Sequence, residues 1–209
     1  MIKAVLFDLD GTLLDTEESI LGAFEYAFKT QTIAQPAREN IVSLVGRPLR
    51  EMYEALAPAA NIEPLLNAHH DFQINNLHLV KAFPGVTETL ATLRKAGLKI
   101  AIVTARYGIT CSVYLDVTNL TNTFDVIITG DDVKKEKPDP EPVLKALAAF
   151  NVQPEEALMV GDTFADIGAG KNAGVKTVGA LYGHMGEKIR DLRPDYLISS
   201  IEEILSIVF

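Results

Sequence analysis

The sequence predicts an α/β protein in which helices cover both faces of a parallel sheet. Short apolar runs end at turn-forming or polar residues, and amphipathic stretches lie between them. Runs that are continuously apolar, rather than alternating, indicate strands buried on both faces. The expected strands span residues 2–7, 99–104, 125–129, 157–161, 176–180 and 196–198. We therefore predict a Rossmann-like core that binds ligands beyond the carboxyl ends of its strands.

Three of the intervening stretches are expected to be helices. They span residues 86–96, 140–150 and 164–173. The second groups Val143, Leu144 and Leu147 on one side, as expected for a helix that packs on a sheet. The alternation of strands and helices supports the parallel order of the sheet.

A helical segment interrupts this alternation after the first expected strand. Residues 15–80 contain no convincing strand. The helices expected there span residues 16–31, 38–45, 48–57 and 63–80. We predict an α/β core formed by residues 1–14 and 81–209, with an inserted α-helical cap domain formed by residues 15–80. Because the insert follows the carboxyl end of a strand, it is a candidate lid.

Composition narrows the classes of partner. The chain has 209 residues, 48% of them apolar, and a net charge of −9. An acidic chain is a poor general binder of nucleic acid or anionic membrane, so we expect neither as a partner. Cys111 is the single cysteine, which excludes an internal disulfide and a cysteine-based zinc cluster. With no signal peptide or membrane span in the sequence, we expect a cytoplasmic protein.

Two carboxylates mark the end of the first expected strand. Asp8 and Asp10 follow it directly, and Gly11 allows a sharp turn. At such a turn the carboxylates can diverge, one toward an electrophile and the other toward its leaving group. Taken alone, the segment could equally be a strand followed by a turn in which Asp is the turn former.

A second acidic pair follows another expected strand. Asp162 leaves the strand at residues 157–161, and Asp166 lies four residues further on. Each alone could cap a helix. Four carboxylates at neighbouring strand ends would repel one another, and a hard cation relieves that repulsion. Since Mg²⁺ prefers oxygen ligands, we expect it here.

Two further segments could hold a phosphate. The Thr104 hydroxyl and the backbone N–H groups that follow it, starting at Ala105, could cradle one at a helix start. Thr104 could also be a simple helix cap. Lys137, held beside Pro138, could balance the carboxylates and the phosphate, or it could belong to a solvated lysine cluster with Lys134 and Lys135.

These four segments resemble the motifs of the haloacid dehalogenase-like hydrolase superfamily, in its phosphoglycolate phosphatase-like branch with a small helical cap. The motifs are matched, in order, by residues 8–12, Thr104, residues 137–138 and residues 161–166. Each motif alone is weak, but their joint match is specific, and the resemblance covers essentially the whole chain.

The resemblance implies a Mg²⁺-dependent phosphatase that acts on a small phosphorylated metabolite. Asp8 would be the nucleophile that forms an aspartyl-phosphate, and Asp10 would be the general acid and base. Thr104, Ala105 and Lys137 would hold the phosphoryl group. The ligands of Mg²⁺ would be Asp8, the main-chain carbonyl of Asp10, Asp162 and, directly or through water, Asp166.

Two arginines are candidate contacts for a second anionic group of the substrate. Arg47 lies in an expected turn between two insert helices, and Arg106 follows Thr104. Arg47 could instead be a surface residue beside a turn, and many relatives differ at position 106. His184 is expected near the rim of the site, where a loop role is equally plausible.

Several alternatives stay open at this point. The same residues would serve a β-phosphoglucomutase-like sugar-phosphate mutase, an inorganic pyrophosphatase or a non-enzymatic phosphate-dependent regulatory module. The presence of Asp10 disfavours a dehalogenase. We expect a monomer or a homodimer.

Overall fold

The computed structural model describes all residues from 1 to 209, and its centre is a six-stranded sheet with the order β5-β4-β1-β6-β7-β8. Every neighbouring pair in the sheet is parallel. The strands are β1 (Ala4–Phe7), β4 (Lys99–Val103), β5 (Val126–Ile128), β6 (Ala157–Gly161), β7 (Lys176–Ala180) and β8 (Tyr196–Ile198). The predicted parallel α/β fold is confirmed, and all six expected strands are present.

The side chains of the central strands alternate between two apolar layers. On β1, Val5 and Phe7 point into one core cluster, while Ala4 and Leu6 point into the other. All four are fully buried. Both faces of the strand therefore need apolar side chains, which explains the continuous rather than alternating pattern in the sequence.

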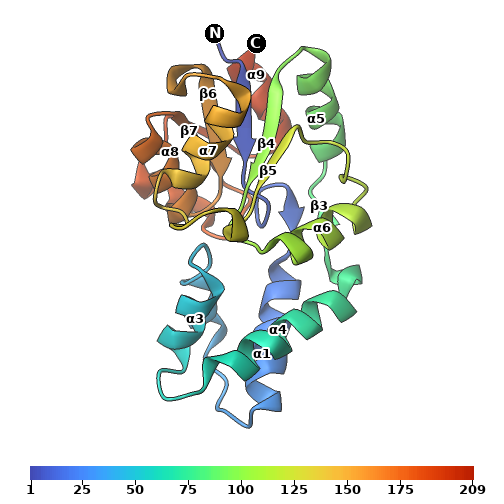
Figure 1. Ribbon diagram of the computed structural model, residues 1–209, viewed down its shortest axis with the longest axis vertical. Coiled ribbons are helices and arrows are strands. Elements are labelled where there is room, and N and C mark those ends of the chain that lie inside the picture. The colour runs from blue at the N-terminus through green and yellow to red at the C-terminus, as the bar shows by residue number, and fades with distance from the viewer.

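Helices cover both layers (Figure 1). Those whose residues join the first cluster are α5 (Val86–Lys95), α6 (Gly108–Val117) and α9 (Leu205–Val208). Those whose residues join the second are α7 (Glu141–Phe150) and α8 (Phe164–Ala173). Short 3-10 helices complete the chain: η1 (Leu77–Leu79), η2 (Gly130–Asp132), η3 (Pro154–Glu156), η4 (Gly186–Leu192) and η5 (Ile201–Ile204). None of the helices combines the length and the apolar character needed to cross a membrane.

Two sequence expectations about these helices were wrong or incomplete. Leu144 was grouped with Val143 and Leu147, but its side chain is 44% exposed while both partners are buried. Leu144 follows Val143 by one residue, and the rotation of the helix between the two turns the Leu144 side chain away from the buried face of α7. For α6 the sequence indicated only a helix start beyond Thr104 and not its extent, because its buried side chains mix polar and apolar types, among them Thr110 and Tyr114.

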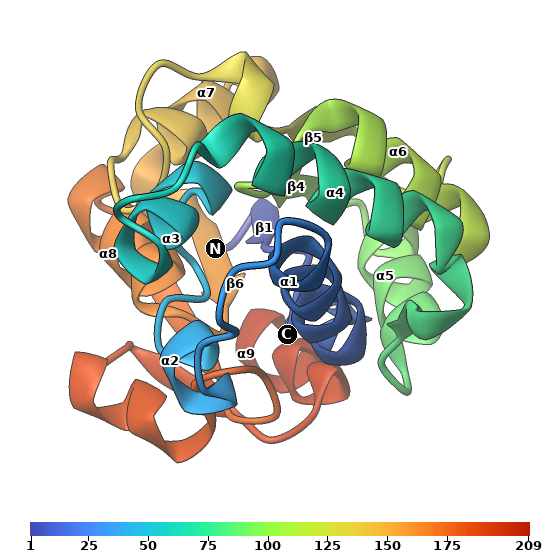
Figure 2. The ribbon, with the colours of Figure 1, turned by 90° about the horizontal axis from the view of Figure 1, so that it is seen from below.

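The helical insert between residues 16 and 80 lies beyond the carboxyl ends of the strands (Figures 1 and 2), and Asp15, which was expected to belong to it, is part of a strand. Its helices are α1 (Glu17–Thr30), α2 (Arg38–Val42), α3 (Leu49–Leu56) and α4 (Ile62–Asn75). A two-residue antiparallel pair, β2 (Leu14–Asp15) with β3 (Lys81–Ala82), joins it to the α/β core. The insert has an apolar cluster of its own, centred on Phe24, Tyr53 and Leu65.

Two helices of the insert end several residues earlier than the sequence predicts. Helix α2 ends at Val42 rather than at residue 45, because Leu44 and Val45 form i,i+3 backbone bonds of a tighter turn. Helix α4 ends at Asn75 rather than at residue 80. There the side-chain amides of Asn75 and Asn76 donate to backbone carbonyls one turn earlier, each at 2.8 Å, and so compete with continuation of the helix.

We expect Leu90→Ala to lower the free energy of unfolding by about 2–5 kcal/mol, because it leaves a cavity in the layer between α5 and the sheet. Leu144→Ala is the matched control, since it removes the same atoms from a side chain that is 44% exposed. Urea unfolding followed by circular dichroism measures both. Equal losses in the two variants would contradict this packing of α5.

Candidate active site

The first acidic segment begins where β1 ends, at the edge of the sheet that faces the insert. The backbone N–H of Asp8 still donates to the carbonyl of Val160 on β6, at 2.9 Å, so the ladder carries Asp8 into place. The chain then turns at Gly11, whose φ is +79°. A Cβ atom there would lie 2.1 Å from His184 Nδ1, so only glycine fits this turn.

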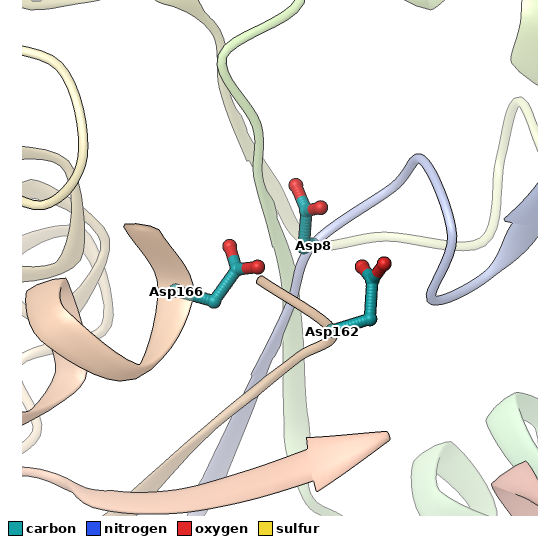
Figure 3. A group of neighbouring side chains, drawn as sticks. All are labelled: Asp8, Asp162 and Asp166. Atoms are coloured by element: carbon teal, nitrogen blue, oxygen red, sulfur yellow. The ribbon is translucent and has the colours of Figure 1, made fainter. Parts of the chain in front are cut away.

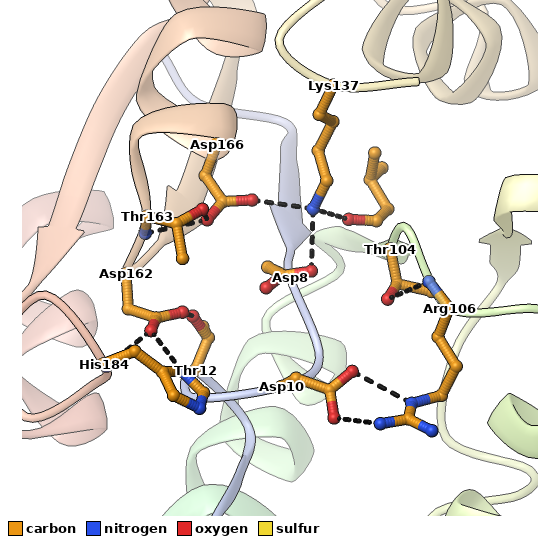
Figure 4. A network of polar contacts seen from close by, with 11 residues as sticks. Asp8, Asp10, Thr12, Thr104, Arg106, Lys137, Asp162, Thr163, Asp166 and His184 are labelled. Carbon is orange, nitrogen blue, oxygen red and sulfur yellow. Dashed lines mark hydrogen bonds and ion pairs between the residues drawn. The ribbon is translucent and has the colours of Figure 1, made fainter. Parts of the chain in front are cut away.

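Lys137 is the cation at the centre of the site (Figure 4). Its Nζ donates to Asp8 Oδ1 at 2.7 Å, to Asp166 Oδ1 at 2.7 Å and to the Val103 carbonyl at 2.8 Å. It is 3% exposed, whereas Lys134 and Lys135 are exposed. Burial alone would lower the pKa of the ammonium, but attraction to Asp166 and Asp8 outweighs it and raises the pKa. The solvated-cluster alternative is therefore wrong for Lys137.

Three carboxylates converge beside it. Asp8, Asp162 and Asp166 are all buried, and one oxygen from each lies within 4.8 Å of the others (Figure 3). Burial, followed by repulsion from Asp166, raises the pKa of Asp8 well above its usual range, even though Lys137 opposes the shift. Each of these oxygens is a hard ligand of the kind that Mg²⁺ binds. The donor set therefore fits the expected cation.

The two carboxylates that follow β6 are also held by neighbouring donors. Thr12 donates its hydroxyl to Asp162 Oδ1 at 2.9 Å, and the His184 backbone N–H donates to Oδ2 at 2.7 Å. Asp166 Oδ2 accepts from the Thr163 backbone N–H at 2.9 Å and from its hydroxyl at 2.6 Å. This second pair of bonds caps α8, so Asp166 does cap the helix, and its Oδ1 also accepts from Lys137 in the site.

His184 is more closely bound to the site than the sequence suggested. Its side chain is 4% exposed, and its Nδ1 lies 2.8 Å from Asp162 Oδ2. Burial disfavours the charged ring, but the hydrogen bond and attraction to Asp162 raise the pKa of His184 to about 9. Without a bound metal, His184 is thus a cation at neutral pH. The neighbouring Gly183 is the sequence signal for this close approach, since a Cβ atom there would lie 2.2 Å from the Cβ of Asp162.

Asp10 diverges from Asp8, as expected, and is engaged by Arg106. The guanidinium donates from Nε to Asp10 Oδ2 at 2.9 Å and from NH2 to Oδ1 at 2.6 Å (Figure 4). Burial would raise the pKa of Asp10, but the attraction and hydrogen bonds of Arg106 lower it. The side chains of Asp10 and Arg106 are 17% and 8% exposed. The sequence predicted neither this pair nor the Gln73 side chain that receives a further bond from Arg106.

The remaining predicted residues line one cavity together with Asp8, Asp10 and Lys137. The volume of this cavity is about 110 Å³. Thr104 is 4% exposed and accepts the Arg106 backbone N–H at 3.1 Å, which starts a turn beyond β4 through Ala105. Arg47 reaches the cavity from the insert, and its guanidinium lies 5.9 Å from the centre of the Phe164 ring on α8. The structure thus brings all the predicted site residues to one place.

The chain belongs to the haloacid dehalogenase-like hydrolase family. The model of that family matches residues 5–180, which include the insert, every acidic residue of the site and all strands of the sheet except β8 and the first residue of β1.

Two curated relatives resemble the chain along almost its whole length. The Pyrophosphatase PpaX of Halalkalibacterium halodurans is 40% identical over 215 residues, which cover 99% of this chain and 97% of the relative. The Pyrophosphatase PpaX of Anoxybacillus flavithermus is 38% identical over 211 residues, again covering 99% and 97%.

Solved structures share the fold. A protein from Haemophilus somnus, described as a predicted phosphoglycolate phosphatase, superposes with a TM-score of 0.89 at 24% identity, over 100% of this chain and 98% of the other. At that identity the likeness establishes the fold and no more.

The raised pKa of His184 predicts a pH-dependent contribution to stability in metal-free protein. An unfolded histidine titrates near pH 6.5, and the folded value is about 9. The contribution is therefore complete below pH 6.5 and is lost as the pH rises to 9. It amounts to about 3.5 kcal/mol at most, since each pKa unit corresponds to about 1.4 kcal/mol.

We expect His184→Asn to destabilise the protein more at pH 6 than at pH 9.5 when both are measured in EDTA. Urea unfolding of the two proteins at each pH gives the difference. The difference in unfolding free energy between the parent and the variant is compared at the two pH values, so the loss of packing, which is the same at both, cancels. Equal losses of unfolding free energy at both pH values would show that folding does not raise the pKa of His184.

Proposed function

We propose that the protein is a Mg²⁺-dependent phosphatase that works through an aspartyl-phosphate on Asp8. The observation that carries the proposal is the free oxygen of Asp8. Its Oδ1 accepts from Lys137, Oδ2 accepts no hydrogen bond from the protein, and the residue lines the cavity at the sheet edge. A buried carboxylate oxygen held this way is positioned for in-line attack on phosphorus.

The chain's own groups account for both chemical steps. The Asp8 oxygen forms a bond to phosphorus while the bond to the leaving oxygen breaks, and the electron pair departs with that oxygen. Because Arg106 lowers the pKa of Asp10, this carboxyl would first take up a proton from solvent and then give it to the leaving oxygen where one is needed. Asp10 then takes a proton from water, which attacks the phosphorus and releases Asp8 and inorganic phosphate.

The other residues hold the phosphoryl group and the cation. Thr104 with the backbone of Ala105, and Lys137, would bind the phosphoryl oxygens. Asp8, the Asp10 main-chain carbonyl, Asp162 and Asp166 would hold Mg²⁺, which supplies charge neutralisation for the transferring group. Asp166 already accepts bonds on both oxygens, so contact through water suits it best. Residues 15–80 would act as a cap that excludes water.

The names of the curated relatives support pyrophosphate as the substrate of this protein. Proteins named as pyrophosphatases are 38% and 40% identical across nearly the full chain, whereas the phosphoglycolate phosphatase likeness rests on a fold comparison at 24% identity. This reverses the order in which the sequence motifs alone ranked the two substrates. Both substrates have an anionic leaving group, and Arg106 and Arg47 lie where such a group would enter.

We expect Asp8→Asn to reduce phosphate release by at least about 10⁴-fold, because the amide cannot form the covalent intermediate. The fold should persist, since the amide oxygen can still accept from Lys137. Asp116→Asn, an exposed change on α6, is the matched control. Phosphate release and circular dichroism are the measurements. Parental turnover by a folded Asp8→Asn protein would rule out the nucleophile.

A substrate panel with and without Mg²⁺ tests the rest of the proposal. We expect activity on pyrophosphate to exceed that on phosphoglycolate, and EDTA to abolish both until Mg²⁺ is restored. β-Glucose 1-phosphate should release phosphate slowly or not at all and should not isomerise. Isomerisation without phosphate release would identify a mutase instead, and activity that survives EDTA would exclude the metal.

A further inference from the structure

Gln73 is a buried amide that reaches from the insert to the core. It lies on α4, its residue is 3% exposed, and its side chain lines the cavity. Its Oε1 accepts from NH1 of Arg106 at 3.0 Å. The amide therefore connects the insert to a side chain that also binds Asp10.

Contacts on three sides fix the Arg106 guanidinium. One edge makes the paired bonds to Asp10, and the other edge donates to Gln73. The flat face covers the buried ring of Tyr114, with the guanidinium carbon 4.1 Å from the ring centre. Tyr114 is itself tied to the insert, because its hydroxyl is hydrogen-bonded to that of Ser19 at 2.7 Å. A planar cation held on two edges and one face has a defined direction.

Arg106 is the cation bound directly to Asp10, the carboxyl that would serve the leaving group, whereas Arg47, the other arginine that lines the cavity, lies against Phe164. Lys137 is engaged by Asp8 and Asp166 on the other side of the cavity. The insert histidines that line the cavity, His69 and His70, carry no charge near neutral pH, because burial lowers the pKa of each. A charge on the leaving group therefore meets Arg106 beside Asp10.

We propose, building on the phosphatase function above, that Gln73 is a positioning residue that directs Arg106 and thereby makes the site select compounds whose leaving group carries a negative charge. Losing the Gln73 acceptor frees one edge of the guanidinium. A carboxylate at the same position competes for the guanidinium and adds a negative charge that repels a charged leaving group. Phosphoryl compounds with uncharged leaving groups do not use that charge, so the same changes affect them less.

The test compares two esters that differ in one charge. 2-Phosphoglycolate and 2-hydroxyethyl phosphate share a two-carbon leaving group and differ in the carboxylate. kcat and KM for both esters and for pyrophosphate are measured in Mg²⁺ for the parent, Gln73→Met and Gln73→Glu. Asn67→Asp, an exposed position on α4, adds the same charge to the same helix as a matched control.

The parent should prefer the charged ester in kcat/KM. That preference should fall by about 10- to 100-fold in Gln73→Glu, the range for losing one charge-assisted hydrogen bond, and by at least about threefold in Gln73→Met. Pyrophosphate should follow phosphoglycolate, and Asn67→Asp should keep the parental ratio.

Three outcomes would overturn the inference and leave the phosphatase function intact. They are no preference for the charged ester in the parent, an equal fall on both esters in both Gln73 variants, and the same change of ratio in Asn67→Asp. If the parent releases phosphate from none of the three compounds, the phosphatase function fails, and the inference fails with it.

Discussion

The site depends on one buried ammonium that holds two carboxylates together. Lys137 lies 2.7 Å from an oxygen of Asp8 and 2.7 Å from an oxygen of Asp166, and all three residues are almost fully buried. Such a pair is costly to break, because removing one partner leaves an uncompensated charge, at about 3–5 kcal/mol. The sheet makes the contact available: β1 and β6 are neighbours in parallel register, with Phe7 beside Val160, so the next residues along both strands emerge together.

The charge balance around Lys137 explains why a cation suits the site. Asp8, Asp162 and Asp166 bring three negative charges, and Lys137 offsets one of them. Protonated His184 offsets part of the remainder at Asp162. Asp10 does not add to the excess, since Arg106 pairs with it directly. The excess negative charge therefore lies on the side of the cavity where the candidate ligands of a divalent ion are gathered. The net charge of −9 over the whole chain does not reveal this local excess.

Sequence reasoning predicted the residues whose place is set by the ends of strands. Asp8, Thr104 and Asp162 follow apolar runs directly, so the parallel sheet brings them together without further information. Gln73 could not be predicted in this way. The apolar pattern of α4 accounts for buried residues such as Leu65 but does not say how the insert is oriented on the core. The extent of helix α6 was missed for a related reason, because Arg106 and the insert, rather than the sheet alone, cover its Tyr114.

Because Gln73 belongs to the insert, the core and the insert hold different sides of the Arg106 guanidinium. Asp10 and the Tyr114 ring, which hold one edge and one face of Arg106, both belong to the core. Only the outer edge is held from the insert, by Gln73. The core therefore places the Arg106 cation beside Asp10, the carboxyl that transfers protons. The insert sets the direction of the remaining N–H donors of Arg106. The insert is joined to the core through two-residue strands, so it can change sequence and orientation without disturbing the sheet edge. Discrimination between leaving groups can thus change through one amide on α4 while Asp8, Lys137 and the acidic ligands stay as they are.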